Sequence, residues 1–188
     1  MTDSGELVAV DVKMVIDDNA LFRHPDLVEL RDDEDFDEVE LKAQRHQLNF
    51  HQMDGDIGVI VNGAGLALAT LDMIHEAGGS PANFMDIRTT AKSLDIAQGV
   101  SLVLDNPHTK VLLVNVCGGG MQPCDTIIDG LGIAFRRKGR VLPIVLRMTG
   151  NNEDLAWLRL ANFNLPTVSF PDMGEAVARA VALAQERK

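Results

Sequence analysis

The 188-residue sequence contains few aromatic residues and fewer basic than acidic ones. Aromatic side chains make up 4% of the chain and tyrosine is absent, so a stacking surface for single-stranded nucleic acid is not expected. The formal net charge is −11, with 28 acidic and 17 basic residues, which argues against binding of phosphate backbones by bulk electrostatics. We therefore expect no nucleic-acid partner, and an anionic ligand would need local donors.

Cysteines are also few, and long apolar runs are missing. Cys117 and Cys124 lack CxxC spacing and nearby histidines, so they do not indicate a zinc site. Cys117 is interpreted as a small apolar residue at a strand end. The N-terminal sequence MTDSGEL has no basic region followed by an apolar core, and no apolar run reaches membrane-spanning length. The sequence therefore predicts a cytoplasmic protein without a membrane partner.

From Asp54 onward, strand patterns alternate with helical patterns. Strands are predicted at residues 57–61, 84–87, 110–116, 141–146 and 168–169, and helices at residues 66–76, 91–104, 125–137, 153–161 and 173–185. Five such units imply right-handed crossovers and a parallel sheet. We predict an α/β fold over residues 54–188, a flavodoxin-like, doubly wound domain with a five-stranded parallel sheet.

The first 53 residues follow a different pattern and predict a short N-terminal β/α appendage. Residues 7–10 suggest a short strand, and residues 12–16 its continuation or partner. The acidic run at residues 32–38 is interpreted as a solvated loop leading into a helix from about Phe36 to Gln47. A cation site in this run is the alternative, although the run lacks the spacing of a calcium-binding loop.

Small or polar residues follow three of the predicted strands, at residues 62–65, 118–120 and 149–152. In a parallel sheet these segments share the carboxyl edge, where ligands usually bind. The glycine turn at residues 118–120 precedes a helix whose N-terminus could bind an anion, or it is an ordinary connection between strand and helix. Asn62 could contact a ligand, cap the next helix or do both, whereas Asn151 and Asn152 are expected to cap.

A family resemblance rests on four motifs. They are DVKMVIDDNALFRHPDL, VNGAGLALATLDMIHEAGGSPANFMDI, VLLVNVCGG followed by CDTIIDGL, and VLRMTGNN. Together they resemble the β subunit of succinyl-CoA synthetase, and related modules occur in malate–CoA ligase and ATP-citrate lyase. The resemblance covers the last half of that subunit. It implies that residues 1–53 are the tail of an ATP-grasp domain with a connecting helix, and that residues 54–188 are the CoA-ligase domain.

The resemblance implies ligation of a small carboxylic acid to CoA, driven by an ATP- or GDP-type nucleotide. The helix after the glycine turn would point its N-terminus at the carboxylate and at a phosphohistidine of an α-like, CoA-binding subunit. The family's substrate-contacting asparagine falls on Asn62. Its substrate- and phosphate-binding glycine loop falls on Gly118, Gly119, Gly120 and Met121.

The resemblance also implies that Asp11 is a magnesium ligand. The other ligands of that site would lie before the start of this sequence, so Asp11 is part of an incomplete site. Nucleotide and Mg²⁺ are therefore expected only in the complete enzyme, with an ATP-grasp half supplied by a separate chain or by a longer parent protein.

Two segments depart from the family pattern. Arg88, Thr89 and Thr90 stand where the family has three glycines, and Gln122 with Pro123 stands where an arginine is usual. Arg88 could replace the lost positive charge, or the site could take a different acid. We therefore keep two functions open, an acid–CoA ligase subunit that is inactive alone and a catalytically degenerate binding or assembly module. A flavodoxin-like sensor is disfavoured, because no acidic cluster follows the strands.

Overall fold

The computed structural model describes residues 3–30, 37–46, 48–119 and 121–186. The chain divides into two compact units, Met1–Asp35 and Phe36–Lys188. Each unit is described by itself below. No helix in these described ranges combines the length and the apolar character needed to span a lipid bilayer.

The N-terminal unit contains a 3-10 helix, η1 (Asp18–Arg23), and a single helical turn, α1 (Pro25–Val28). Residues 6–17 form no strand, and their large apolar side chains, among them Leu7, Val10 and Val15, are mostly exposed. The strands predicted at residues 7–10 and 12–16 are therefore wrong for this structure. A strand requires backbone partners on a neighbouring strand, and no other described segment pairs with these residues.

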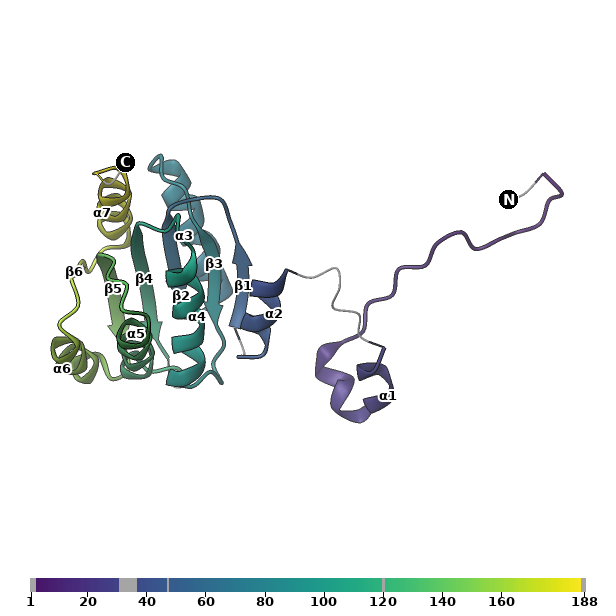
Figure 1. Cartoon of the computed structure of the whole chain (residues 1–188), viewed down its shortest axis with the longest axis horizontal. Coiled ribbons are helices and arrows are strands. Elements are labelled where there is room, and N and C mark those ends of the chain that lie inside the picture. The colour runs from purple at the N-terminus through teal and green to yellow at the C-terminus, as the bar shows by residue number, and fades with distance from the viewer. Residues whose placement is uncertain (1–2, 31–36, 47, 120, 187–188) are drawn as a thin grey trace. The chain divides into compact units, whose positions relative to one another are not determined.

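The second unit is built on a six-stranded sheet with the order β1-β3-β2-β4-β5-β6 (Figure 1). The strands are β1 (Leu48–Gln52), β2 (Ile57–Val61), β3 (Asn83–Ile87), β4 (Val111–Gly118), β5 (Ile144–Gly150) and β6 (Thr167–Ser169). All neighbouring pairs are parallel except β1 with β3. The predicted doubly wound α/β fold is confirmed, with one strand more than predicted.

Helices cover both faces of this sheet. They are α2 (Glu38–Gln44), α3 (Ala64–Glu76), α4 (Ser93–Asp105), α5 (Cys124–Lys138), α6 (Glu153–Phe163) and α7 (Met173–Glu186). One core cluster joins the sheet to α2, α4, α5 and α6, and the other joins it to α3 and α7. Every residue of β2 is buried, as expected for a central parallel strand covered on both faces.

The additional strand, β1, runs antiparallel to β3 at one edge of the sheet. Leu48 and Phe50 are buried in the core, whereas Asn49 and His51 alternate with them on the other face. Helix α2 and β1 thus belong to the second compact unit, although the sequence analysis assigned them to residues 1–53. The origin of those residues in an ATP-grasp domain stays a prediction.

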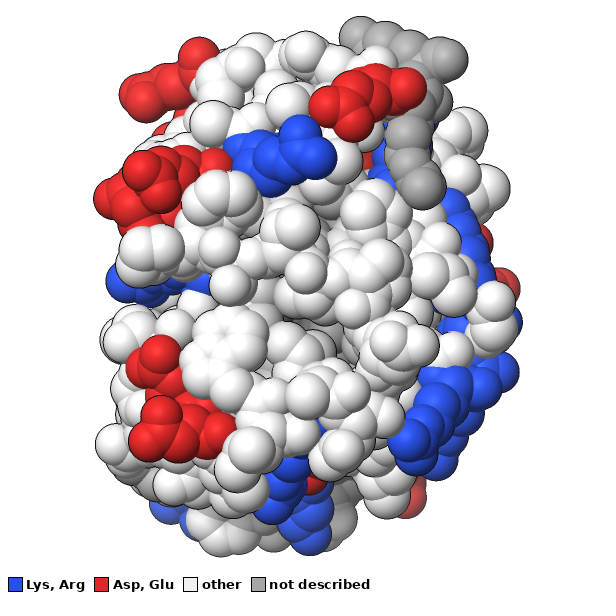
Figure 2. Space-filling model, turned by 90° about the vertical axis from the view of Figure 1, so that its left-hand side faces the viewer, with Lys and Arg blue, Asp and Glu red and all other residues white. Residues whose placement is uncertain are grey.

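The opposite edge of the sheet is β6, which pairs only with β5 among the described residues. Figure 2 shows that this side of the molecule has a largely uncharged centre with charged side chains around it. Val168 and the α6 residues Leu155 and Leu158 are exposed.

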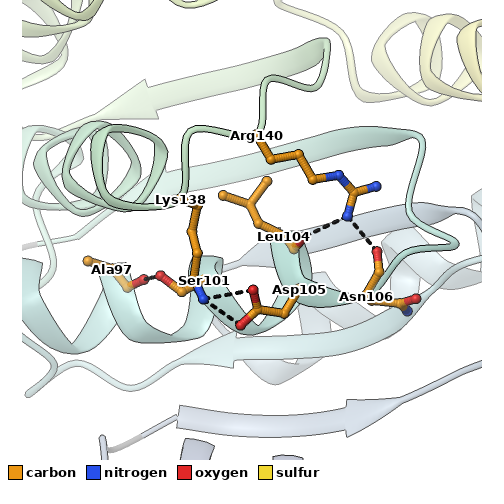
Figure 3. Close-up of polar contacts among 7 residues, drawn as sticks. All are labelled: Ala97, Ser101, Leu104, Asp105, Asn106, Lys138 and Arg140. Carbon is orange, nitrogen blue, oxygen red and sulfur yellow. Dashed lines mark hydrogen bonds and ion pairs between the residues drawn. The ribbon is translucent and has the colours of Figure 1, made fainter.

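At the amino ends of β4 and β5, Arg140 connects two loops (Figure 3). Its guanidinium donates hydrogen bonds to the carbonyl oxygens of Leu104 (2.5 Å), Asn106 (2.7 Å) and Thr109 (2.5 Å). Carbonyls at the C-terminus of a helix have no partner within the helix, and Arg140 supplies one for α4. Arg140 therefore holds together the segments that precede β4 and β5.

Candidate functional site

A pocket of about 620 Å³ lies where β2, β3 and β4 end. Its lining residues are Asn62, Gly63, Asp86, Ile87, Arg88, Thr89, Thr90, Cys117, Gly119, Met121 and Gln122. The pocket thus brings together most of the predicted site residues. The third predicted segment, residues 149–152, follows β5 on the same edge but does not line the pocket. Pockets of this volume accommodate small organic molecules.

The side-chain amide of Asn62 hydrogen-bonds to the backbone of β4, as a neighbouring strand would. Its Oδ1 atom accepts a hydrogen bond from the backbone N–H of Cys117 (2.9 Å), and its Nδ2 atom donates to the Cys117 carbonyl (2.7 Å). It does not cap α3, whose N-cap residue is Gly63 with φ +104° and no side-chain cap. Capping by Asn62 is therefore wrong, and its contact with a substrate stays a prediction.

Asp86 links the end of β3 to the start of α3. Its Oδ1 atom accepts from the backbone N–H of Gly63 (2.6 Å), and its Oδ2 atom accepts from Asn49 Nδ2 (3.1 Å). The residue is 7% exposed. A buried carboxylate with both oxygens hydrogen-bonded is well accommodated, so Asp86 holds the first turn of α3 at the pocket.

Arg88 is exposed at the pocket, and Asn49 anchors it. Its Nε and Nη2 atoms lie 3.2 and 3.0 Å from Asn49 Oδ1. Asn49 is not among the site residues predicted from the sequence, because β1 was not predicted. The alternation of Leu48 and Phe50 with Asn49 and His51 was the signal that could have found it.

The glycine turn is tightly packed at its start and open afterwards. Gly118 ends β4 opposite Gly150, and a Cβ atom on Gly118 would lie 2.6 Å from the Cys124 sulfur. A Cβ atom on Gly119 would meet nothing within 4 Å, and Met121 is exposed. Gly120 lies outside the described residues. The turn therefore requires glycine at Gly118 for packing.

Gln122 joins the glycine turn to the turn that contains Arg88. With its amide nitrogen facing the carbonyl oxygens, the buried Gln122 side chain donates to Thr89 O (3.2 Å) and Ala91 O (3.3 Å). That orientation is assigned from the hydrogen-bond partners. The two segments that depart from the family pattern thus contact one another.

The N-terminus of α5 already carries a negative charge. Asp125, in the first turn, accepts from Asn152 Nδ2 (3.0 Å) and forms an ion pair with Arg159 (3.2 Å). A carboxylate here is favoured by the helix dipole, and Arg159 compensates its charge. Asn152 occupies the N-cap position of α6, but its side chain makes no cap hydrogen bond, so its predicted role as a cap is wrong. Asn151 precedes that N-cap position, so its predicted capping is wrong as well.

The two cysteines are free thiols in different environments. Cys117 is at a strand end as predicted, although it is exposed. Cys124 is buried, and its sulfur lies 3.4 Å from the Thr149 carbonyl. Burial raises the pKa of the Cys124 thiol above its ordinary value of 9.0, and the nearby charge of Glu153 raises it further. Cys124 is therefore a neutral packing residue at physiological pH and not an activated nucleophile.

The described residues do not provide a magnesium site. Asp11 is exposed, and its Oδ1 atom accepts from the backbone N–H of Val12 (2.8 Å). Nowhere in the described ranges do three or more His, Cys, Asp or Glu side chains gather closely enough to hold a metal. Residues 31–36 lie outside these ranges, including most of the acidic run, and Asp37 caps α2 by accepting from Val39 and Glu40. The helix predicted from about Phe36 is confirmed as α2.

Comparison with known proteins identifies the family. Residues 60–181 match the model of the CoA-ligase family. The succinate–CoA ligase [ADP-forming] subunit β of Anaeromyxobacter dehalogenans (strain 2CP-C) is 42% identical over 185 residues, which are 98% of this chain and 47% of that protein. The protein of the same name from Cupriavidus pinatubonensis is 42% identical over 100% of this chain and 48% of its own length. The chain spans about half the length of these curated relatives.

Solved structures agree on the fold. ATP citrate lyase from Methanothrix soehngenii, solved in complex with citrate and coenzyme A, superposes with a TM-score of 0.73 at 17% sequence identity. The match covers 91% of this chain and 49% of that one. At this identity the likeness establishes the fold alone, while the family match rests on the sequence. The chain belongs to the CoA-ligase family.

Proposed function

We propose that the chain is the C-terminal part of the β subunit of an acid–CoA ligase similar to succinyl-CoA synthetase. Within a heteromer, it binds a small carboxylic acid, and the phosphohistidine of an α-like, CoA-binding subunit, at the carboxyl edge of its sheet. The observation that carries this proposal is the pocket there, which lies where three parallel strands end and is lined by Arg88 and by Gly63, the N-cap of α3, whose own N–H donates to Asp86. Backbone N–H groups at a helix N-terminus attract carboxylates and phosphates.

In this proposal the residues of the chain bind and orient the carboxylic acid and the phosphohistidine. Asp86 holds Gly63 at the pocket, Asn62 holds the end of β4, and Gly119 leaves space for a ligand. Nucleotide and Mg²⁺ supply the phosphoryl group and its charge compensation, and we assign them to an ATP-grasp half outside this chain. The relatives are about twice as long as this chain. We place the heteromer in the cytoplasm, since both cysteines are free thiols.

The test is reconstitution of the heteromer. The 188-residue chain is combined with an α-like subunit and with the N-terminal half of the Anaeromyxobacter dehalogenans β subunit. With labelled ATP and Mg²⁺, we expect an acid-labile phosphohistidine on the α-like subunit, and then acyl-CoA when succinate and CoA are added. Lys42→Gln, on the exposed surface of α2, is the matched control and retains activity. Acyl-CoA formed by the chain alone would contradict the proposal.

A second candidate is a catalytically degenerate assembly module that keeps the fold and the partner surface. Two observations favour it: both polar atoms of the Asn62 amide are already bonded to Cys117, and Asp125 places a carboxylate in the first turn of α5. The same reconstitution distinguishes the two. A heteromer that assembles but never phosphorylates its histidine supports the assembly module and excludes the ligase.

A further inference from the structure

The turn that follows β3 carries the cation of the pocket at the carboxyl edge. Residues 88–91 form a tight turn, closed by a hydrogen bond from the Ala91 N–H to the Arg88 carbonyl (3.0 Å). Arg88, Thr89 and Thr90 are exposed, whereas Ala91 is buried in the core. Arg88 is the only Lys or Arg among the described residues that line the pocket. The position of this charge therefore depends on a turn that projects into solvent.

Gln122 reaches this turn from a distant part of the chain. The residue lies just before α5 and is 3% exposed. Its amide nitrogen donates to the carbonyl oxygens of Thr89 (3.2 Å) and Ala91 (3.3 Å). A buried amide without these acceptors would carry the full cost of its desolvation, so the arrangement is strongly favoured. Gln122 therefore ties the segment before α5 to the turn that carries Arg88.

Asn49 holds Arg88 in a different way. Its Oδ1 atom lies 3.2 and 3.0 Å from Nε and Nη2 of Arg88, so Asn49 contacts the guanidinium while Gln122 contacts the backbone of the turn. A guanidinium carries five N–H donors in a planar fork, and anchoring by one oxygen leaves donors for a ligand. A donor that is ordered before binding loses less conformational entropy when the ligand arrives. Fixing the turn therefore contributes to binding without any contact with the ligand.

We propose that Gln122 is a positioning residue of this pocket, which holds the turn at residues 88–91 so that the Arg88 guanidinium is preorganised for an anion. The inference rests on the proposed function and deepens it, because it concerns the same pocket. The Gln122 amide nitrogen is directed at two carbonyl oxygens and not at the ligand. Gln122 thus acts through Arg88, and its effect on anion binding disappears when the guanidinium is removed.

A double-mutant cycle tests the inference, with inorganic phosphate as the anion and NMR titration of the whole chain as the measurement. Phosphate should shift the Nε–H signal of Arg88. Gln122→Met, which keeps the length of the side chain but not its donors, should weaken binding about fivefold. Arg88→Gln should weaken binding about tenfold, and the double variant should bind no more weakly than Arg88→Gln alone. Gln52→Met, the same exchange at an exposed position of β1, is the control and leaves the affinity unchanged.

Additive losses in the cycle would overturn the inference, because a merely structural Gln122 weakens the pocket whether or not Arg88 is present. The inference also fails if phosphate does not bind or leaves the Arg88 signal unmoved, if Gln122→Met keeps its affinity, or if Gln52→Met loses as much. Should Gln122→Met not fold, Gln122→Asn takes its place in the cycle, since it keeps the amide but shortens its reach. The cycle involves no α-like subunit and no phosphoryl transfer, so positioning by Gln122 and ligation by the heteromer can fail separately.

Discussion

Arg140 and Arg88 lie at opposite ends of the same sheet and use their guanidinium groups differently. Arg140, at the amino ends of β4 and β5, donates to carbonyl oxygens of the last turn of α4 and of the loop that follows it. Arg88, beyond the carboxyl end of β3, contacts one side-chain oxygen, Asn49 Oδ1, through Nε and Nη2. A guanidinium that donates to several backbone carbonyls stabilises structure, whereas one that is only anchored can bind a ligand.

Another cation near the amino ends, Lys110, is also engaged by the protein itself. A second pocket, of about 420 Å³, lies there, and among its lining residues Lys110 forms an ion pair with Asp56 at 3.0 Å. The pocket at the carboxyl ends instead combines an anchored cation with the N-cap of α3, Gly63, whose N–H donates to Asp86. The two pockets therefore differ in the charged group that lines each, an ion-paired lysine at the amino ends and an anchored arginine at the carboxyl ends.

The largest effect is expected at Gly150, where the carboxyl end of the sheet is most tightly packed. Gly150 has φ +112°, and a Cβ atom there would lie 2.3 Å from the Gly118 carbonyl oxygen. Gly150→Ala adds backbone strain to a clash with backbone, so we expect a loss of about 4 kcal/mol in unfolding free energy. Urea denaturation measures it. Gly119→Ala is the control, since its Cβ meets open space, and an equal loss there would contradict this account.

The next largest effect is expected at the amino end, from Arg140→Ala. This change removes the guanidinium donors from the carbonyls of Leu104, Asn106 and Thr109, although Asn106 keeps the bond from the Thr109 N–H, and we expect a loss of about 3 kcal/mol. Urea denaturation measures the loss, with the exposed Arg137→Ala as control. An equal loss in Arg137→Ala would contradict this account.

Much of this architecture was predictable from local pattern, because β2 and β4 are central and buried. β1 was not, because Leu48–Gln52 is short and its partner β3 lies more than thirty residues downstream. The Asn49 contact depends on that register, so no local motif contains it. The prediction of a strand at residues 7–10 was wrong for the converse reason. Its residues have high strand propensity, but no other described segment pairs with them. Gln122 could be located in sequence, although its contact with the Arg88 turn required the structure.

A smaller effect is expected from Cys124 as the pH rises. Burial raises its folded-state pKa above 9.0, so the folded state holds the thiol proton at pH values where the unfolded state has lost it. The stabilisation is therefore complete below about pH 9 and is lost as the pH rises through the folded-state pKa. Urea denaturation of the unaltered chain and of Cys124→Ala, at about pH 8 and about pH 10.5, measures it. Equal pH dependence in both proteins would contradict the prediction.

The smallest effect is expected for the ion pair between Lys138 and Asp105, close to Arg140 (Figure 3). Lys138 Nζ lies 2.6 Å from Asp105 Oδ2, but the two side chains are 32% and 56% exposed. Water screens such a pair, so a double-mutant cycle of Lys138→Ala and Asp105→Ala should give a coupling energy of about 0.5 kcal/mol, reduced at high salt. Arg140 contributes several times more from the same region because it donates to three backbone carbonyl oxygens at once. A coupling energy as large as the Arg140→Ala loss would show that charge, and not carbonyl satisfaction, stabilises this end of the sheet.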